Sequence, residues 1–148
     1  MKKTFFLTAI FFLSALAFCA EPELICAARP PKNVAAAKIN YDFTKMNYNM
    51  ASGIVFDMMI DPETYKNKTA KIQGEFRSEV HEGKRLCAVV VWDAGGCCPT
   101  GLTVVPLAGK KYPADFPAEG SKTTVTGALE ILELFGSPAL CLVADLWE

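Results

Sequence analysis

The chain has 148 residues, of which 51% are hydrophobic, and a formal net charge of −1 at pH 7. Proteins that hold a nucleic-acid backbone need a clustered basic surface, so this near-neutral balance excludes nucleic acid as a partner. The length fits one domain of about 100 residues with an additional N-terminal portion.

Residues 1–17 have the features of a secretory signal peptide. Lys2 and Lys3 precede an apolar run, and Ala15 and Ala17 satisfy the small-x-small rule for cleavage after residue 17. The alternative is a membrane anchor, but the apolar run is near the lower limit of about 17 residues for a spanning helix. We therefore expect an exported protein whose formal charge falls from −1 to −3 when both lysines are removed.

Lipidation at Cys19 is a second processing route. Leu16 and Ala17 occupy the positions where a bacterial lipobox has an aliphatic and a small residue. Phe18 is large for the position before the cysteine, which favours simple cleavage after Ala17. The mature protein is thus predicted to be periplasmic, or to contact a bacterial membrane only through a lipid on Cys19.

Residues 18–49, which precede the domain, are predicted to form a flexible spacer, because their prolines and scattered Ala, Lys and Asn show no hydrophobic periodicity. Met50–Ile60 then has the apolar spacing of a short amphipathic helix, with Ser52 as its cap and its methionines packed in the core. Residues 61–68 predict one further turn, which Asn67 ends in a left-handed conformation.

Five later segments predict β-strands, because they alternate apolar and polar residues or are rich in β-branched residues. Gly74 and Gly127 lie in mid-strand, which indicates sharp coiling in a small closed barrel. Residues 50–148 are therefore predicted to be mainly β, a five-stranded OB-type barrel with one short N-terminal helix, in preference to a seven-stranded sandwich. The expected strands are 69–77, 86–92, 102–107, 123–131 and 139–146.

The stretch from Arg85 to Val105 joins two β-branched runs through a reversal that contains Cys97 and Cys98. Adjacent cysteines fill a core poorly, so this turn indicates sulfur chemistry. The third and fifth strands of an OB-type meander are parallel, which predicts that Cys141, at the start of the fifth, shares a barrel end with the pair. Cys87 is predicted to be a separate buried thiol near the other end.

Three interpretations of these sulfurs remain open. Export into an oxidising compartment favours a disulfide between Cys141 and either Cys97 or Cys98. A soft-metal site for zinc or copper, formed by Asp93 with these three cysteines, is the alternative. No CxxC spacing or nearby histidine supports a standard zinc signature, so the expected cofactor is none, with zinc or copper second. The third interpretation is inert buried cysteine.

No catalytic constellation stands out in the sequence. The single histidine, His81, lies in a hairpin that is predicted to be solvated, and no positioned base accompanies a cysteine nucleophile. Phe76 and Trp92 lack interleaved Lys or Arg, so they indicate packing rather than base stacking. We therefore predict that the protein is not an enzyme.

Parts of the chain resemble a family of small, uncharacterised bacterial OB-like domains that are commonly exported or lipid-anchored. The resemblance runs from about Ile54 to Asp145 and is carried by residues 65–76, 86–94, 97–102 and 112–117. Asp93 with the double cysteine is also similar to the soluble domain of a proposed permease-partner family associated with metal handling. The resemblance implies an OB fold but no reaction, and its motif cysteines correspond to Cys87, Cys97, Cys98 and Cys141.

Together these features predict an exported OB-fold binding or interaction module without catalytic activity, acting on a small ligand or a protein partner. The alternative is a thiol-based protein that binds or transfers zinc or copper through the turn at Cys97 and Cys98. Bound metal and accessible thiols would distinguish the two.

Overall fold

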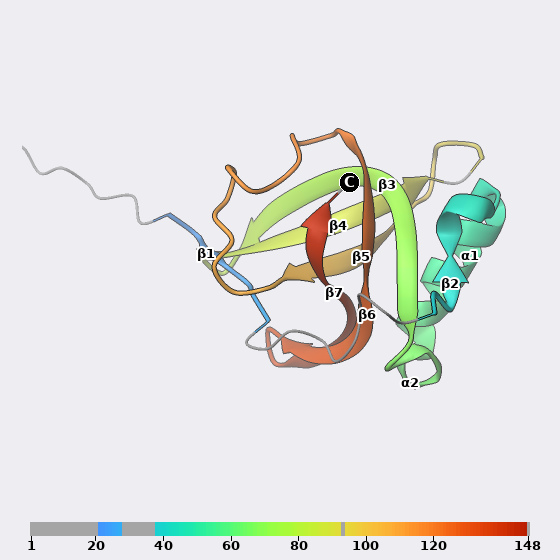
Figure 1. Ribbon diagram of the computed structural model, residues 1–148, viewed down its shortest axis with the longest axis horizontal. Helices are drawn as coiled ribbons and strands as arrows, with labels where there is room; N and C mark the ends of the chain where they lie inside the picture. The colour runs from blue at the N-terminus through green and yellow to red at the C-terminus, as the bar shows by residue number, and fades with distance from the viewer. Residues whose placement is uncertain (1–20, 28–37, 93, 148) are drawn as a thin grey trace, which may run out of the picture.

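The computed structural model describes residues 21–27, 38–92 and 94–147 (Figure 1). The predicted leader, its cleavage site, Cys19 and Asp93 lie outside the described residues. The described part is mainly β, with two short α-helices and one 3-10 turn. Its elements are β1 (Glu23–Leu24), β2 (Tyr41–Asp42), η2 (Phe43–Lys45), α1 (Tyr48–Ile60), α2 (Pro62–Tyr65), β3 (Thr69–His81), β4 (Lys84–Trp92), β5 (Pro99–Pro106), β6 (Lys122–Leu134) and β7 (Ser137–Trp147).

The strands form one mixed sheet in the order β1-β4-β5-β7-β6-β3-β2, and a further pairing of β3 with β4 closes five of them into a ring. The five long strands are the five that the sequence predicts. Pairing within the ring is antiparallel except between β5 and β7, where Thr103 lies opposite Cys141. The predicted parallel pairing of the third and fifth strands is confirmed.

Two mid-strand glycines allow adjacent strands to approach closely. Strand β3 pairs with β6 up to Glu75 and with β4 from Glu75 onward, so it changes partner beside Gly74. A Cβ atom on Gly74 would lie 2.7 Å from Cγ1 of Val89 and would overlap the carbonyl oxygen of Val90. A Cβ atom on Gly127 would overlap the carbonyl oxygen of Val143 in the same way. The sequence predicts sharp coiling at these two glycines, and the structure shows a close approach of the neighbouring strand at both.

Helix α1 packs against β4, β5 and β7. It begins two residues earlier than predicted because the side chain of Asn47, rather than Ser52, caps it by accepting a hydrogen bond of 2.9 Å from the Met50 N–H. Its buried face is Ala51, Val55 and Met58. The other two helix methionines are exposed, so only one of the three packs in the core as predicted. The left-handed Asn67 that follows α2 is confirmed, with a φ of 63°.

The flexible spacer predicted for residues 18–49 is wrong for 21–27 and 38–49. The first segment runs alongside β4, where the N–H of Ile25 donates to the carbonyl oxygen of Arg85. It then reaches β5, where the N–H of Ala27 donates to the carbonyl oxygen of Pro106. Strand β2 in the second segment pairs in parallel with β3. Strands of two residues are too short to show a hydrophobic period, so the sequence pattern gave no sign of this pairing.

The connection between β5 and β6 covers part of the ring. Its Phe116 ring lies 6.1 Å from Phe76 and 5.6 Å from Trp147, while Tyr112 lies 5.7 Å from Phe116. Helix α1 and β1 lie at opposite sides of the ring (Figure 1). The ring therefore has a helical side and a side formed by the N-terminal segment and this aromatic connection.

Candidate functional site

Cys97 and Cys98 lie on the turn between β4 and β5, directly before Pro99. Both side chains are exposed. Their sulfur atoms are 3.7 Å apart, well beyond the S–S bond of about 2.05 Å. The left-handed Gly96, with a φ of 65°, precedes them in the reversal. The turn therefore presents two neighbouring sulfurs to solvent.

Cys141 does not join this pair. Strand β7 begins at Ser137, so Cys141 lies in the middle of the strand, opposite Thr103. Because Thr103 is four residues beyond Pro99, the register places Cys141 about 13 Å along the strand from the end of β5 that the pair precedes. Two predictions required Cys141 to lie close to the turn: its disulfide with Cys97 or Cys98, and the four-ligand metal site. That placement is wrong, although the strand order on which it rested is correct.

The described residues contain no group of three or more His, Cys, Asp or Glu side chains placed to hold a metal ion. Asp93, the fourth member of the predicted metal site, lies outside the described residues. Of the predicted ligands, the structure therefore brings together Cys97 and Cys98.

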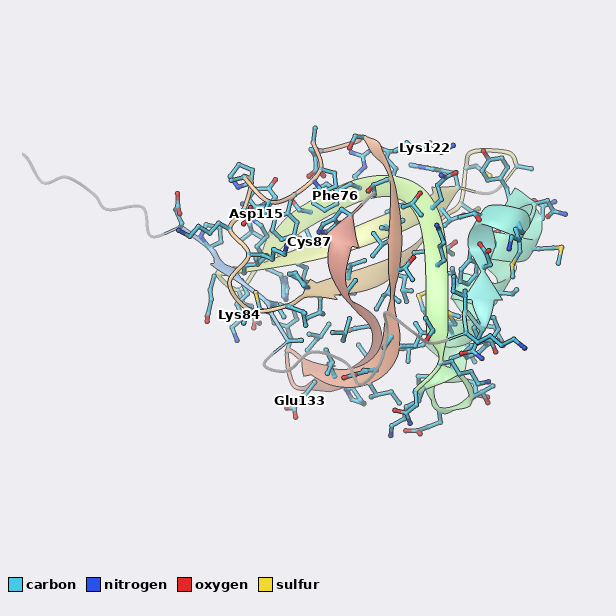
Figure 2. All side chains as sticks on the ribbon, in the orientation of Figure 1. Phe76, Lys84, Cys87, Asp115, Lys122 and Glu133 are labelled. Carbon is cyan, nitrogen blue, oxygen red and sulfur yellow. The ribbon has the colours of Figure 1, made fainter. Side chains whose placement is uncertain are left out.

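Cys87 is a separate buried thiol, as predicted, and it lies opposite Val104, two residues before the end of β5. It lies on β4, three residues after Lys84, and both residues are labelled in Figure 2. Burial raises the pKa of Cys87 to about 12, and burial raises the pKa of Cys141 to about 12 as well. Both thiols therefore stay protonated at neutral pH, which makes them poor nucleophiles and poor metal ligands.

His81 is exposed at the hairpin between β3 and β4, as predicted. Its ring packs edge-on against Phe135 at 4.7 Å between centroids. Its Nε2 atom is 3.9 Å from a carboxylate oxygen of Glu82. These contacts are those of a surface residue.

A recess in the surface lies on the side of the ring near β1. This cleft, which we call the basic cleft, has a volume of about 680 Å³. Its walls come from the N-terminal segment, the start of β4 and the connection after β5. They are lined by Glu21, Pro22, Leu24, Arg85, Lys110, Lys111, Tyr112 and Pro113.

Arg85 is held in place within the basic cleft. The centre of its guanidinium group lies 3.9 Å from the centroid of the Tyr112 ring, a cation–π contact. One of its N–H groups donates to Oγ of Ser78 at 3.0 Å, and the same oxygen lies 3.2 Å from the Tyr112 hydroxyl. Glu119 accepts from the backbone N–H of Ser78 at 2.9 Å and fixes this arrangement from behind.

A smaller recess of about 230 Å³ lies beside Gly74 on β3 and Trp92 on β4. Its carboxylate, Glu75, accepts a hydrogen bond of 3.0 Å from the indole N–H of Trp92 and forms an ion pair with Arg77. Protein groups thus already satisfy this carboxylate, and the volume is below the range of about 300–1,000 Å³ that small-molecule sites occupy, which leaves the basic cleft as the stronger candidate for a ligand.

Sequence reasoning missed the basic cleft. The adjacent Lys110, Lys111 and Tyr112 were a local signal, since two cations beside an aromatic ring are a common arrangement for binding anions. Arg85 lies far from them in the sequence, and Leu24 belongs to the segment that was expected to be a spacer. Only tertiary structure brings these residues together.

No protein-family model matches the chain, and a search of curated proteins found no match. The resemblance to exported OB-like domains therefore stays a prediction. Among the described residues, no helix is both long and apolar enough to cross a membrane.

Proposed function

We propose that the protein is an exported binding module without catalytic activity, built on a five-stranded OB-type barrel. The strand order of the ring, its parallel β5–β7 pair and the partner change of β3 beside a glycine support this fold. The leader-like residues 1–17 support export, to the periplasm or to a lipid anchor at Cys19.

The basic cleft is the single observation that carries the binding function. Its volume of about 680 Å³ lies within the range of about 300–1,000 Å³ that small-molecule sites occupy. It combines apolar walls with a few fixed polar groups, which is the composition of a ligand site rather than of a protein core. The held geometry of Arg85 means that little side-chain entropy would be lost on binding.

The test is retention of a small molecule by the mature protein. The protein is dialysed against a periplasmic small-molecule extract from an exporting bacterial host, and retained compounds are identified by mass spectrometry. We expect a compound that wild type retains and Tyr112→Ala does not. If both proteins retain the same compounds, the basic cleft is not the site. If a compound is converted in excess of the protein present, the absence of catalysis is refuted.

The alternative function is binding or transfer of zinc or copper through Cys97 and Cys98. One observation favours it: the two sulfurs are exposed and 3.7 Å apart, so one soft metal ion could contact both. Two thiolates leave further coordination positions open to a partner, which suits transfer better than permanent storage.

Metal analysis separates the two functions, since the thiols of Cys97 and Cys98 are exposed in either case. The binding-module proposal expects protein purified from the periplasm to contain less than one zinc or copper ion per chain. A stoichiometric metal that is lost in Cys97→Ser with Cys98→Ser, and retained in Cys141→Ser, would establish the metal function instead.

A further inference from the structure

The basic cleft carries more positive than negative charge. Arg85, Lys110 and Lys111 line it against the single carboxylate of Glu21. Within the part of the chain that the structure describes, Arg85 forms no ion pair with a carboxylate. Its direct contacts are the neutral groups Ser78 and Tyr112, and the Glu119 carboxylate lies beyond Ser78, accepting a hydrogen bond of 3.1 Å from the same hydroxyl. The cleft thus has in its wall a guanidinium group that no carboxylate among the described residues contacts directly.

The geometry of Arg85 suits an oxyanion. A guanidinium group has five N–H donors in a planar fork, and one of them is used by Ser78. Stacking on Tyr112 occupies one face of the fork and leaves its edge for hydrogen bonds. Phosphate and carboxylate groups match this edge because two parallel N–H···O bonds can form at once.

The remaining wall is apolar. Pro22 and Leu24 contribute it from the N-terminal segment, and Pro113 with the Tyr112 ring contributes it from the connection after β5. Inorganic phosphate alone would leave these surfaces in contact with water. A ligand that fills the cleft therefore needs an apolar part as well as a charged head.

We propose that the basic cleft binds an amphiphilic molecule with an oxyanion head, which pairs with Arg85 and Lys111, and an apolar body, which packs against Leu24 and Tyr112. This inference rests on the proposed binding function and adds the chemical class of its ligand. The same head-and-body chemistry occurs in soluble acyl phosphates or carboxylates and in anionic membrane lipids.

The probe is octyl phosphate below its micelle-forming concentration, titrated calorimetrically into the mature protein. Inorganic phosphate lacks the apolar body, and octylammonium reverses the charge of the head. We expect octyl phosphate to bind at least about tenfold more tightly than either, because burial of the body and pairing of the head both contribute.

Three charge-removing variants locate the site. Arg85→Gln should weaken octyl phosphate binding by about tenfold or more, because it removes charge-assisted hydrogen bonds. Lys111→Gln should weaken it by about threefold, as expected for an exposed point charge. Lys84→Gln is the matched control: it is adjacent to Arg85, removes the same charge and does not line the cleft, so it should leave the affinity within about twofold. Lys111 is exposed, so its variant tests the site even if Arg85→Gln folds poorly.

A second arm separates the two sources of the ligand. Vesicles of phosphatidylglycerol are sedimented with the protein, and phosphatidylcholine vesicles serve as the control. Sedimentation that Arg85→Gln reduces and Lys84→Gln does not reduce supports a membrane headgroup. Binding of octyl phosphate without such sedimentation supports a soluble amphiphile.

The inference is overturned if octyl phosphate does not bind, if octylammonium binds equally well, or if Lys84→Gln loses as much affinity as Arg85→Gln. The proposed binding function would still hold after such a result if the dialysis experiment finds a compound that wild type retains and Tyr112→Ala does not. Failure of both experiments removes the binding function itself.

Discussion

Individual cysteines in this protein differ by burial rather than by sequence context. Cys87 and Cys141 lie on ring strands with their pKa values raised to about 12, whereas Cys97 and Cys98 are exposed on a turn. At pH 8 a thiol with a pKa of about 12 has roughly a thousandfold less thiolate than one at the ordinary value of 9.0. Of these four cysteines, the two on the turn are therefore the ones that a thiol reagent in solvent reaches directly.

Labelling with iodoacetamide should reflect this division. In native, reduced protein at pH 8 we expect Cys97 and Cys98 to be alkylated quickly, and Cys87 and Cys141 only as fast as the chain opens. Peptide mass spectrometry measures each site, and protein in guanidinium chloride, where Cys87 and Cys141 should react as fast as Cys97 and Cys98, is the control. Rapid native labelling of either buried cysteine would contradict the burial described above.

The same pKa values predict a pH dependence of stability. In the unfolded chain these thiols should ionise near 9.0, whereas in the folded state they ionise near 12. The unfolded state thus releases its protons first, and the free energy of unfolding should fall as pH rises from about 9 to about 12. Urea unfolding at several pH values measures the slope, which should be shallower in Cys141→Ala. An equal slope in that variant would mean that Cys141 does not contribute.

Among the elements, strand β3 depends on the missing side chain of Gly74. It pairs with β6 and then with β4, and Gly74 lies where the second partner crosses closest. Gly74→Val should lower the free energy of unfolding by about 2 kcal/mol or more, since the added atoms would overlap the Val90 carbonyl oxygen. Chemical denaturation measures this change.

Gly53 provides the matched control for that substitution. It lies on the exposed side of α1, and no atom is within 4 Å of the position that a Cβ would occupy. Gly53→Ala should leave the stability unchanged or raise it by up to about 1 kcal/mol, because alanine favours helix. Gly127→Val should behave like Gly74→Val. If both valine variants match wild type, the close strand approach at these glycines is wrong.

For the whole molecule, export and the basic cleft are connected through the N-terminal segment. Cleavage after Ala17 would place Phe18 at the new terminus, only three residues before Glu21 on the cleft wall. A lipid on Cys19 would place the cleft close to the membrane surface. If the leader is processed as proposed, the route of processing would determine what the cleft faces.

The mass of the mature N-terminus tests the processing prediction. Protein isolated from an exporting host should begin at Phe18, or should carry a diacylglycerol on Cys19. Intact mass spectrometry with N-terminal peptide sequencing distinguishes these forms, and cytoplasmic expression without export provides the unprocessed reference. Recovery of chains that still begin at Met1 from the exporting host would count against both routes.

The sequence by itself determined the features that depend on local periodicity. Alternation and β-branched residues located the five long strands, glycines in mid-strand indicated coiling, and Asn67 indicated a left-handed turn. Each of these signals lies within a few residues of the structure that it predicts, which is why no tertiary information was needed.

Tertiary structure alone decided how far each strand extends and which side chains meet. Phe135 and Gly136 both adopt positive φ and form a two-residue turn that extends β7 back to Ser137, so Cys141 falls in mid-strand and away from the cysteine turn. The two-residue strands β1 and β2 pair with β4 and β3, although the segment that contains them has no periodic pattern. Arg85 and Tyr112 are 27 positions apart and meet only because the connection after β5 folds back over the start of β4. Such contacts depend on the register and closure of the whole ring, which no local pattern encodes.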